Sequence, residues 1–70
     1  MDGKIVNSRG VHVADFKGSI VYGLGGEPMF SLKGRNIYRL SGELVGHLLN
    51  GSGSIRRLDK RNDQLFNWVS

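Results

Sequence analysis

Short segments rich in Val, Ile, Leu, Tyr and Phe alternate with glycines along the whole chain. The glycines at these boundaries follow one another every seven to nine residues, at Gly3, Gly10, Gly18, Gly26, Gly34, Gly42 and Gly51. Apolar segments of this length between turn residues are typical of strands in an all-β sandwich or barrel. We predict strands at 4–7, 11–16, 19–23, 27–32, 36–40, 43–49, 54–58 and 64–69.

The sequence repeats with a period of 16 residues. When residues 16–32 are laid over residues 32–48, the identical positions include Lys17/Lys33, Gly18/Gly34, Tyr22/Tyr38, Leu24/Leu40, Gly26/Gly42 and Glu27/Glu43. Each unit contains two strands and their turn, which makes it one β-hairpin. We therefore predict one all-β domain, residues 1–70, of four tandem hairpins at about 3–17, 18–33, 34–50 and 51–69. The hairpins are expected to form a small antiparallel barrel or a flower-like sheet.

The last unit departs from the repeat. Arg56 stands where the other units have tyrosine, and Lys60 stands where they have a turn glycine. Leu58, Leu65 and Phe66 also fall on one helical face. A short C-terminal helix is the alternative, although the repeat favours a strand at 64–69.

The tandem Gly-x-x-Ile-Tyr and Gly-Glu hairpins resemble small bacterial repeat domains of the four-fold beta-flower type. The resemblance covers most of residues 3–58. It implies hairpin units arranged around a pseudo-symmetry axis, and it implies no particular activity.

Alternation along the strands predicts two apolar sheet faces. One set, Tyr22, Leu24, Tyr38, Leu40 and Leu58 with Phe16, Phe30, Leu32, Leu44 and Leu48, is expected to fill the centre. The other set, Val21, Ile37, Met29, Val45 and Ile55, is the candidate interaction surface, most simply covered by a second copy of the chain. The alternative is a twisted, closed barrel that buries parts of both sets by itself.

The chain is also small and lacks cysteine, so neither a disulfide nor a thiolate zinc site can stabilise it. The uncovered apolar set and the small size of the chain both lead us to expect a homo-oligomer. No apolar run is long enough to span a membrane, and the N-terminal residues do not begin a signal peptide. A cytoplasmic protein without a membrane partner is therefore expected.

Ten Lys and Arg against six Asp and Glu give a net charge of +4. This modest excess supports nucleic-acid binding as an alternative function, because cations neutralise phosphates while aromatic rings stack on bases. The candidate residues are Arg35, Arg39, Arg56, Arg57, Lys60, Arg61 and Trp68. Tyr22 and Tyr38 are expected in the core rather than on this surface, which makes nucleic-acid binding the less favoured function.

No enzyme signature is found. Neither His12 nor His47 is close in sequence to a serine or acidic partner that would complete a catalytic triad, and Glu27 and Glu43 are explained by their equivalent turn positions. Asp59, Asn62 and Asp63 lack the spacing of a calcium loop. We predict no catalytic, cofactor or metal site, and a structural or protein-interaction module that self-associates.

Overall fold

Seven short strands and one 3-10 helix make up the part of the chain that the computed structural model describes, residues 2–50 and 53–66. The strands are β1 (Asp2–Val6), β2 (His12–Lys17), β3 (Ile20–Gly23), β4 (Pro28–Lys33), β5 (Asn36–Arg39), β6 (Leu44–His47) and β7 (Ile55–Arg57). The helix is η1 (Lys60–Phe66). The all-β prediction is confirmed.

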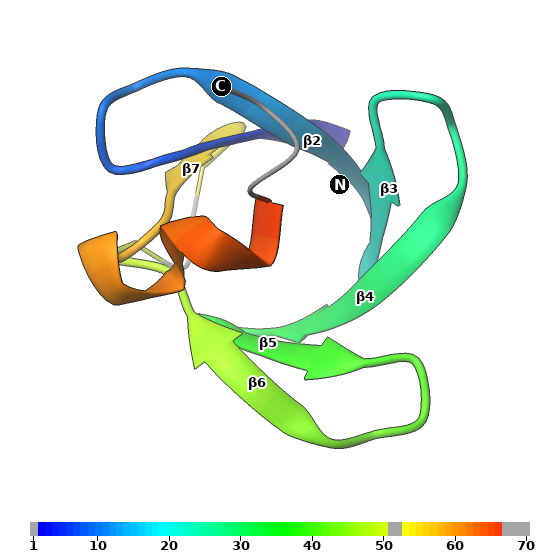
Figure 1. Cartoon of the computed structure of the whole chain (residues 1–70). Coiled ribbons are helices and arrows are strands. Elements are labelled where there is room, and N and C mark those ends of the chain that lie inside the picture. Colours follow the sequence, from blue (N-terminus) through cyan, green and yellow to red (C-terminus); the bar gives the residue numbers. More distant parts are fainter. Residues whose placement is uncertain (1, 51–52, 67–70) are drawn as a thin grey trace.

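The strands form a single curled sheet in the order β6-β5-β4-β3-β2-β1-β7. Strands β1 to β6 pair antiparallel with their neighbours in the sequence, whereas β7 pairs parallel with β1. The ends of the sheet meet where Leu48 bridges Leu58 and the Leu49 amide donates to the Arg57 carbonyl over 2.8 Å. The sheet therefore curls into a barrel-like ring around η1 (Figure 1).

Two kinds of tight connection produce this meander. Lys33 pairs with Asn36 across a two-residue turn in which Gly34 has φ +60°, as a type II′ turn requires of its first central residue. The connection from β5 to β6 is of the second kind: the Gly42 amide donates to the Arg39 carbonyl over 2.8 Å, and Gly42 has φ +102°. The same two connections recur at the equivalent positions of the other hairpins, which explains the even spacing of glycines.

Each hairpin carries a β-bulge at the same place in its second strand. In the second hairpin Val21 faces Phe30 but Tyr22 faces Pro28, so Met29 is the extra residue. Val13 and Val45 are the extra residues of the first and third hairpins. A bulge increases the local twist, and its repetition helps to curl the sheet.

The core lies inside the curled sheet and is built from repeat-equivalent positions. Its buried members are Ile5, Val13, Ala14, Phe16, Val21, Phe30, Leu32, Ile37, Leu48, Leu58 and Phe66. Most come from the sheet, and Phe66 comes from η1. The chain thus encloses one apolar core by itself, as the alternative with a closed barrel predicted.

Three of the four predicted hairpins form, and the fourth does not. In the last unit β7 is a single strand, and residues 60–66 form η1, so the strand predicted at 64–69 is wrong over 64–66. The rest of that strand, 67–69, lies outside the described residues. Without a turn glycine at Lys60 the chain cannot make the hairpin connection of the other units, and Phe66 instead packs edge-on against Phe30 with ring centroids 5.4 Å apart.

Polar contacts hold η1 in place. The backbone amide and hydroxyl of Ser8 both donate to the Asp63 carboxylate, the amide over 2.9 Å. The His47 amide donates to Asn62 Oδ1 over 2.8 Å. Gly46 lets the helix approach, because a Cβ at this position would lie 2.8 Å from Asn62 Nδ2. These contacts tie η1 to the first and third hairpins.

Candidate binding grooves

The structure corrects the interaction surface predicted from the sequence. Val21 and Ile37 are fully buried inside the chain and cannot contact a partner. Met29 and Val45 are partly buried and pack against the core. Of the predicted surface only Ile55 is well exposed, at 61%. The expected apolar face without an intramolecular partner therefore does not exist.

The two faces were assigned wrongly because the register could not be foreseen. Val21 pairs with Phe16 on one side and with Phe30 on the other, so all three side chains point inward. Tyr22 and Tyr38 alternate with Val21 and Ile37 along β3 and β5, so they lie on the outer face and are half-exposed, not in the core. The extra residue at each bulge shifts the alternation of the second strand by one position, so Leu44, beyond the bulge at Val45, points outward. From the same set Leu24, Leu40 and Leu44 are exposed as well.

The residues predicted to bind nucleic acid are brought together only in part. Arg39 pairs with Glu43 over 2.9 Å in the third hairpin. The Arg56 guanidinium lies 4.4 Å from the centre of the Phe16 ring, and the Arg57 guanidinium donates to the Ser8 carbonyl over 2.9 Å.

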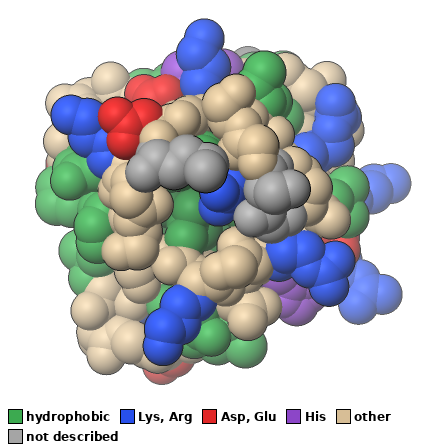
Figure 2. Space-filling view, turned by 180° about the vertical axis from the view of Figure 1, so that it is seen from behind, with side chains coloured by type: hydrophobic (Ala, Val, Ile, Leu, Met, Phe, Trp, Pro, Cys, Tyr) green, Lys and Arg blue, Asp and Glu red, His purple; other side chains and the backbone are tan. Residues whose placement is uncertain are grey.

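The other members of this set come from separate elements. Arg35 lies in the turn between β4 and β5, Lys60 and Arg61 lie on η1, and Trp68 lies outside the described residues. Figure 2 shows Lys and Arg side chains spread around one face of the molecule rather than gathered in a single patch.

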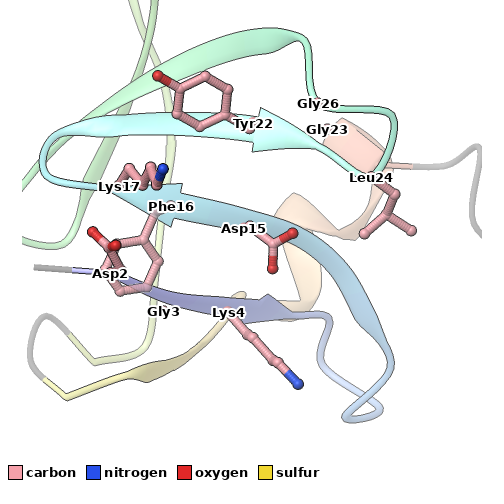
Figure 3. Close-up of a pocket in the computed structure, with 10 residues that line it drawn as sticks. All are labelled: Asp2, Gly3, Lys4, Asp15, Phe16, Lys17, Tyr22, Gly23, Leu24 and Gly26. Atoms are coloured by element: carbon pink, nitrogen blue, oxygen red, sulfur yellow. The ribbon is translucent and has the colours of Figure 1, made fainter.

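A groove of about 640 Å³ opens on the surface of the first hairpin, beside the loop of the second. Asp2 and Lys4 line it from β1, Asp15 and Lys17 from β2, and Tyr22 from β3 (Figure 3). Gly3, Phe16, Gly23, Leu24 and Gly26 complete the lining. The groove is an open cleft between one hairpin and the next.

The same groove recurs on the second hairpin. A smaller groove, of about 300 Å³, is lined by Ser19, Ser31, Leu32, Lys33, Tyr38 and Gly42. Each of these residues stands 16 positions after a residue of the first groove: Gly3, Asp15, Phe16, Lys17, Tyr22 and Gly26. The Lys-Gly-x-x-[Val/Ile]-Tyr repeat therefore places one lysine and one tyrosine at each of the two grooves.

A third groove, of about 420 Å³, follows on the third hairpin. It is lined by Arg35, Asn36, His47, Leu48, Leu49 and Asp59. All except Asp59 stand 32 positions after a residue of the first groove, so the three grooves occupy equivalent places on successive hairpins. The third lacks the lysine and tyrosine, because Leu49 replaces the lysine and the repeat ends at β7.

The three grooves differ in charge. In the first, Asp15 Oδ1 accepts a hydrogen bond from His12 Nε2 over 2.8 Å, and Asp2 adds a second carboxylate. The second groove has no acidic lining residue: serine stands where the first has Asp15. The third combines Arg35 and His47 with Asp59. One framework thus carries three different sets of polar groups.

The other candidate polar residues have structural roles. Asp59 accepts a hydrogen bond from the Arg61 amide, Asn62 from the His47 amide and Asp63 from Ser8. The hydrogen bonds from Ser8 hold the pKa of the Asp63 carboxyl below its ordinary value. These three side chains, considered from the sequence as cation ligands, are used to shape and attach η1.

Lys17/Lys33 and Tyr22/Tyr38 are recognisable in the sequence as repeat equivalents, but the sequence did not place them at a site. Ser19 and Ser31 were not predicted as site residues. The signal that could have found the grooves was the repeat itself, since residues recurring at one period recur at one place in the fold.

Among the residues that the structure describes, no helix has the length and apolar character needed to cross a membrane. Comparison of the chain with protein-family models, with curated proteins and with solved structures gave no match. The resemblance to four-fold beta-flower domains stays a prediction.

Proposed function

We propose that the chain is a small, non-enzymatic protein-interaction module that binds an extended polypeptide segment along its outer face. The observation that carries the proposal is the recurrence of one groove on three successive hairpins. Equivalent grooves at regular intervals suit a ligand whose own groups recur at regular intervals, as side chains do along an extended peptide.

Contacts through side chains fit this surface better than addition of a strand to the sheet edge. At the edge of β6, the His47 amide donates to Asn62 Oδ1, and beyond it the Leu49 amide donates to the Arg57 carbonyl. At the edge of β7, the Arg57 amide donates to Asn50 Oδ1 over 3.0 Å. With these donors occupied, the outer grooves are the more accessible binding surface.

The charges of the grooves favour a polypeptide over a nucleic acid. Asp2 and Asp15 line the first groove and Asp59 lines the third, and carboxylates at these places repel phosphates. A polypeptide offers both signs of charge and so suits a surface of mixed charge.

Nucleic-acid binding is the alternative, favoured by the outward positions of Tyr22 and Tyr38 beside Lys17 and Lys33. It predicts that affinity for an oligothymidine of twelve nucleotides falls steeply with salt concentration. Absence of binding at low salt would exclude it.

The proposal is tested with random twelve-residue peptides displayed on phage and selected against the immobilised full chain. Enriched peptides should bind at least about tenfold more weakly to the double variant Tyr22→Ser, Tyr38→Ser, because aromatic side chains often contribute most of the affinity at such sites. The control is Ile55→Ser, which removes a side chain that is 61% exposed and lies outside all three grooves. Failure to enrich any sequence, or equal binding to the double variant, would contradict the proposal.

The homo-oligomer expected from the sequence has lost one of its two grounds, because the supposed interface residues Val21 and Ile37 belong to the core. The other ground, the small size of the chain, stands, and self-association stays a prediction. It requires that the melting temperature rise with protein concentration. Sedimentation at micromolar concentration measures it directly, and a monomer with a constant melting temperature would exclude it.

A further inference from the structure

The second groove presents hydrogen-bond donors without any carboxylate. Its polar side chains are the hydroxyls of Ser19, Ser31 and Tyr38 and the ammonium group of Lys33. Within the described part of the chain, none of these four side chains has a hydrogen bond or an ion pair. Three hydroxyls and one ammonium group are therefore available to a ligand.

The charge near this groove is positive. Gly42 lines the groove, and the acidic residue Glu43 follows it in the loop between β5 and β6. Its carboxylate accepts a hydrogen bond from Arg39 Nε over 2.9 Å, so this ion pair offsets its charge. Lys33 remains without an acidic partner among the described residues, which favours an anion in the groove.

We propose that the second groove binds a phosphate group, as carried by a phosphomonoester. A phosphomonoester has close to two negative charges near pH 7 and three oxygens that accept hydrogen bonds. Hydroxyl donors together with a lysine are suited to this group. The groove of about 300 Å³ is at the small end of ligand sites, which agrees with a phosphate and its immediate attachment rather than a large ligand.

The first groove provides an internal comparison, because it has the same framework with different charges. Lys17 and Tyr22 correspond to Lys33 and Tyr38, but Asp15 replaces Ser31. A carboxylate at this position repels phosphate. The first groove should therefore not bind a phosphomonoester, although it has the same lysine and tyrosine.

The test is a titration of the ¹⁵N-labelled full chain with O-phosphoserine at fixed ionic strength, followed by the backbone amide resonances. We expect saturable shifts at Ser19, Ser31 and Lys33, with a dissociation constant on the order of millimolar, as suits an open groove in water. Ser31→Asp should weaken binding at least about tenfold, and Lys33→Gln should weaken it severalfold.

Two further variants use the comparison between the grooves. Lys17→Gln should leave binding unchanged, because it alters the first groove only. The double variant Asp2→Asn, Asp15→Ser removes both carboxylates of the first groove and should create a second set of saturable shifts around Lys17 and Tyr22, weaker than the first because Gly3 stands where the second groove has Ser19. The proposal is overturned if the shifts are linear and spread over all lysines, or if Ser31→Asp binds as tightly as the original chain.

The source of the phosphate is resolved by repeating the titration with a hexapeptide that contains one phosphoserine. Tighter binding of the hexapeptide than of O-phosphoserine supports a phosphorylated polypeptide, and equal binding supports a small phosphorylated molecule. Both results uphold a phosphate site. The site does not depend on the proposed peptide-binding function, since phosphate binding succeeds or fails whatever the phage selection gives.

Discussion

The first three hairpins and the C-terminal unit make contrasting contributions to one small fold. Each hairpin is built from contacts between residues near in sequence, with its turns, its bulge and its groove at equivalent places. The C-terminal unit instead makes distant contacts: β7 lies beside β1, and Asp63 binds Ser8, 55 residues away in the sequence. Repetition builds the curled sheet, whereas a segment that departs from the repeat joins its ends and fills its centre.

The C-terminal unit supplies a side chain from η1 to the centre of the curled sheet. Phe66 fills that place, with 1% of its surface exposed, and contacts Phe30 of the second hairpin. The substitutions below separate the contributions of the hairpins from those of the C-terminal unit.

Phe66→Ala should have the largest effect. It removes a fully buried aromatic ring and leaves a cavity, which typically costs about 3–5 kcal/mol of unfolding free energy. Chemical denaturation measures this cost. Gln64→Ala, an exposed substitution in the same helix, is the control and should change stability by less than about 0.5 kcal/mol. If both variants are equally stable, η1 does not complete the core.

Gly46→Ala tests the contact between the third hairpin and η1. The new Cβ would lie 2.8 Å from Asn62 Nδ2 and 3.1 Å from Leu65 Cδ1, so η1 must shift and weaken the hydrogen bond from the His47 amide. We expect a loss of about 1–3 kcal/mol. Adding Asn62→Ala should cost less in this background than in the original chain, because the hydrogen bond is already weakened. Strict additivity of the two changes in denaturation experiments would show that the contact is not strained.

Gly42→Ala tests a hairpin alone. Nothing lies within 4 Å of the new Cβ, so the whole cost is the strain of a residue with φ +102°, about 1–2 kcal/mol. Ser41→Ala in the same loop should be nearly neutral. Thermal or chemical unfolding compares the two, and an equal stability would mean that the loop relaxes to a negative φ.

The smallest effect is expected from the pH dependence of the link between Ser8 and Asp63. Hydrogen bonds from Ser8 lower the pKa of the folded-state carboxyl below its ordinary value of 3.8. The carboxylate therefore stabilises the fold above that pH, and this stabilisation is lost as the pH falls through the lowered pKa. The difference in unfolding free energy between the original chain and Asp63→Asn should shrink on acidification from pH 6 to pH 2.

NMR titration of the Asp63 carboxyl carbon measures the pKa directly. Ser8→Ala should raise it towards its ordinary value, because the hydroxyl donor is the largest cause of the shift. An unchanged pKa in this variant would show that the hydroxyl does not hold the carboxylate.

The repeat made much of the fold predictable. Strand positions near 11–16, 19–23, 27–32 and 36–40 agree with β2 to β5 within two residues at either end, because alternating apolar residues and turn glycines act locally. The candidate site was less predictable. Lys17 and Lys33 were recognised as equivalents, but a groove arises only where one hairpin meets the loop of the next, and such meetings depend on how far the sheet curls.

What the sequence determined by itself was the number and spacing of strands through β6, together with the places of their turns. These follow from local preferences, namely the positive φ that the turns require and the period of two along a strand. The tertiary structure decided which face became the core. Val21 points inward because it pairs with Phe16 and Phe30, and Ile37 does so because it pairs with Leu32. The extra residue at each bulge then turns the rest of the second strand the other way, and its position is set by pairing with another strand. The parallel pairing of β7 and the burial of Phe66 were likewise decided by distant partners, because a segment outside the repeat takes its conformation from the surface that it covers.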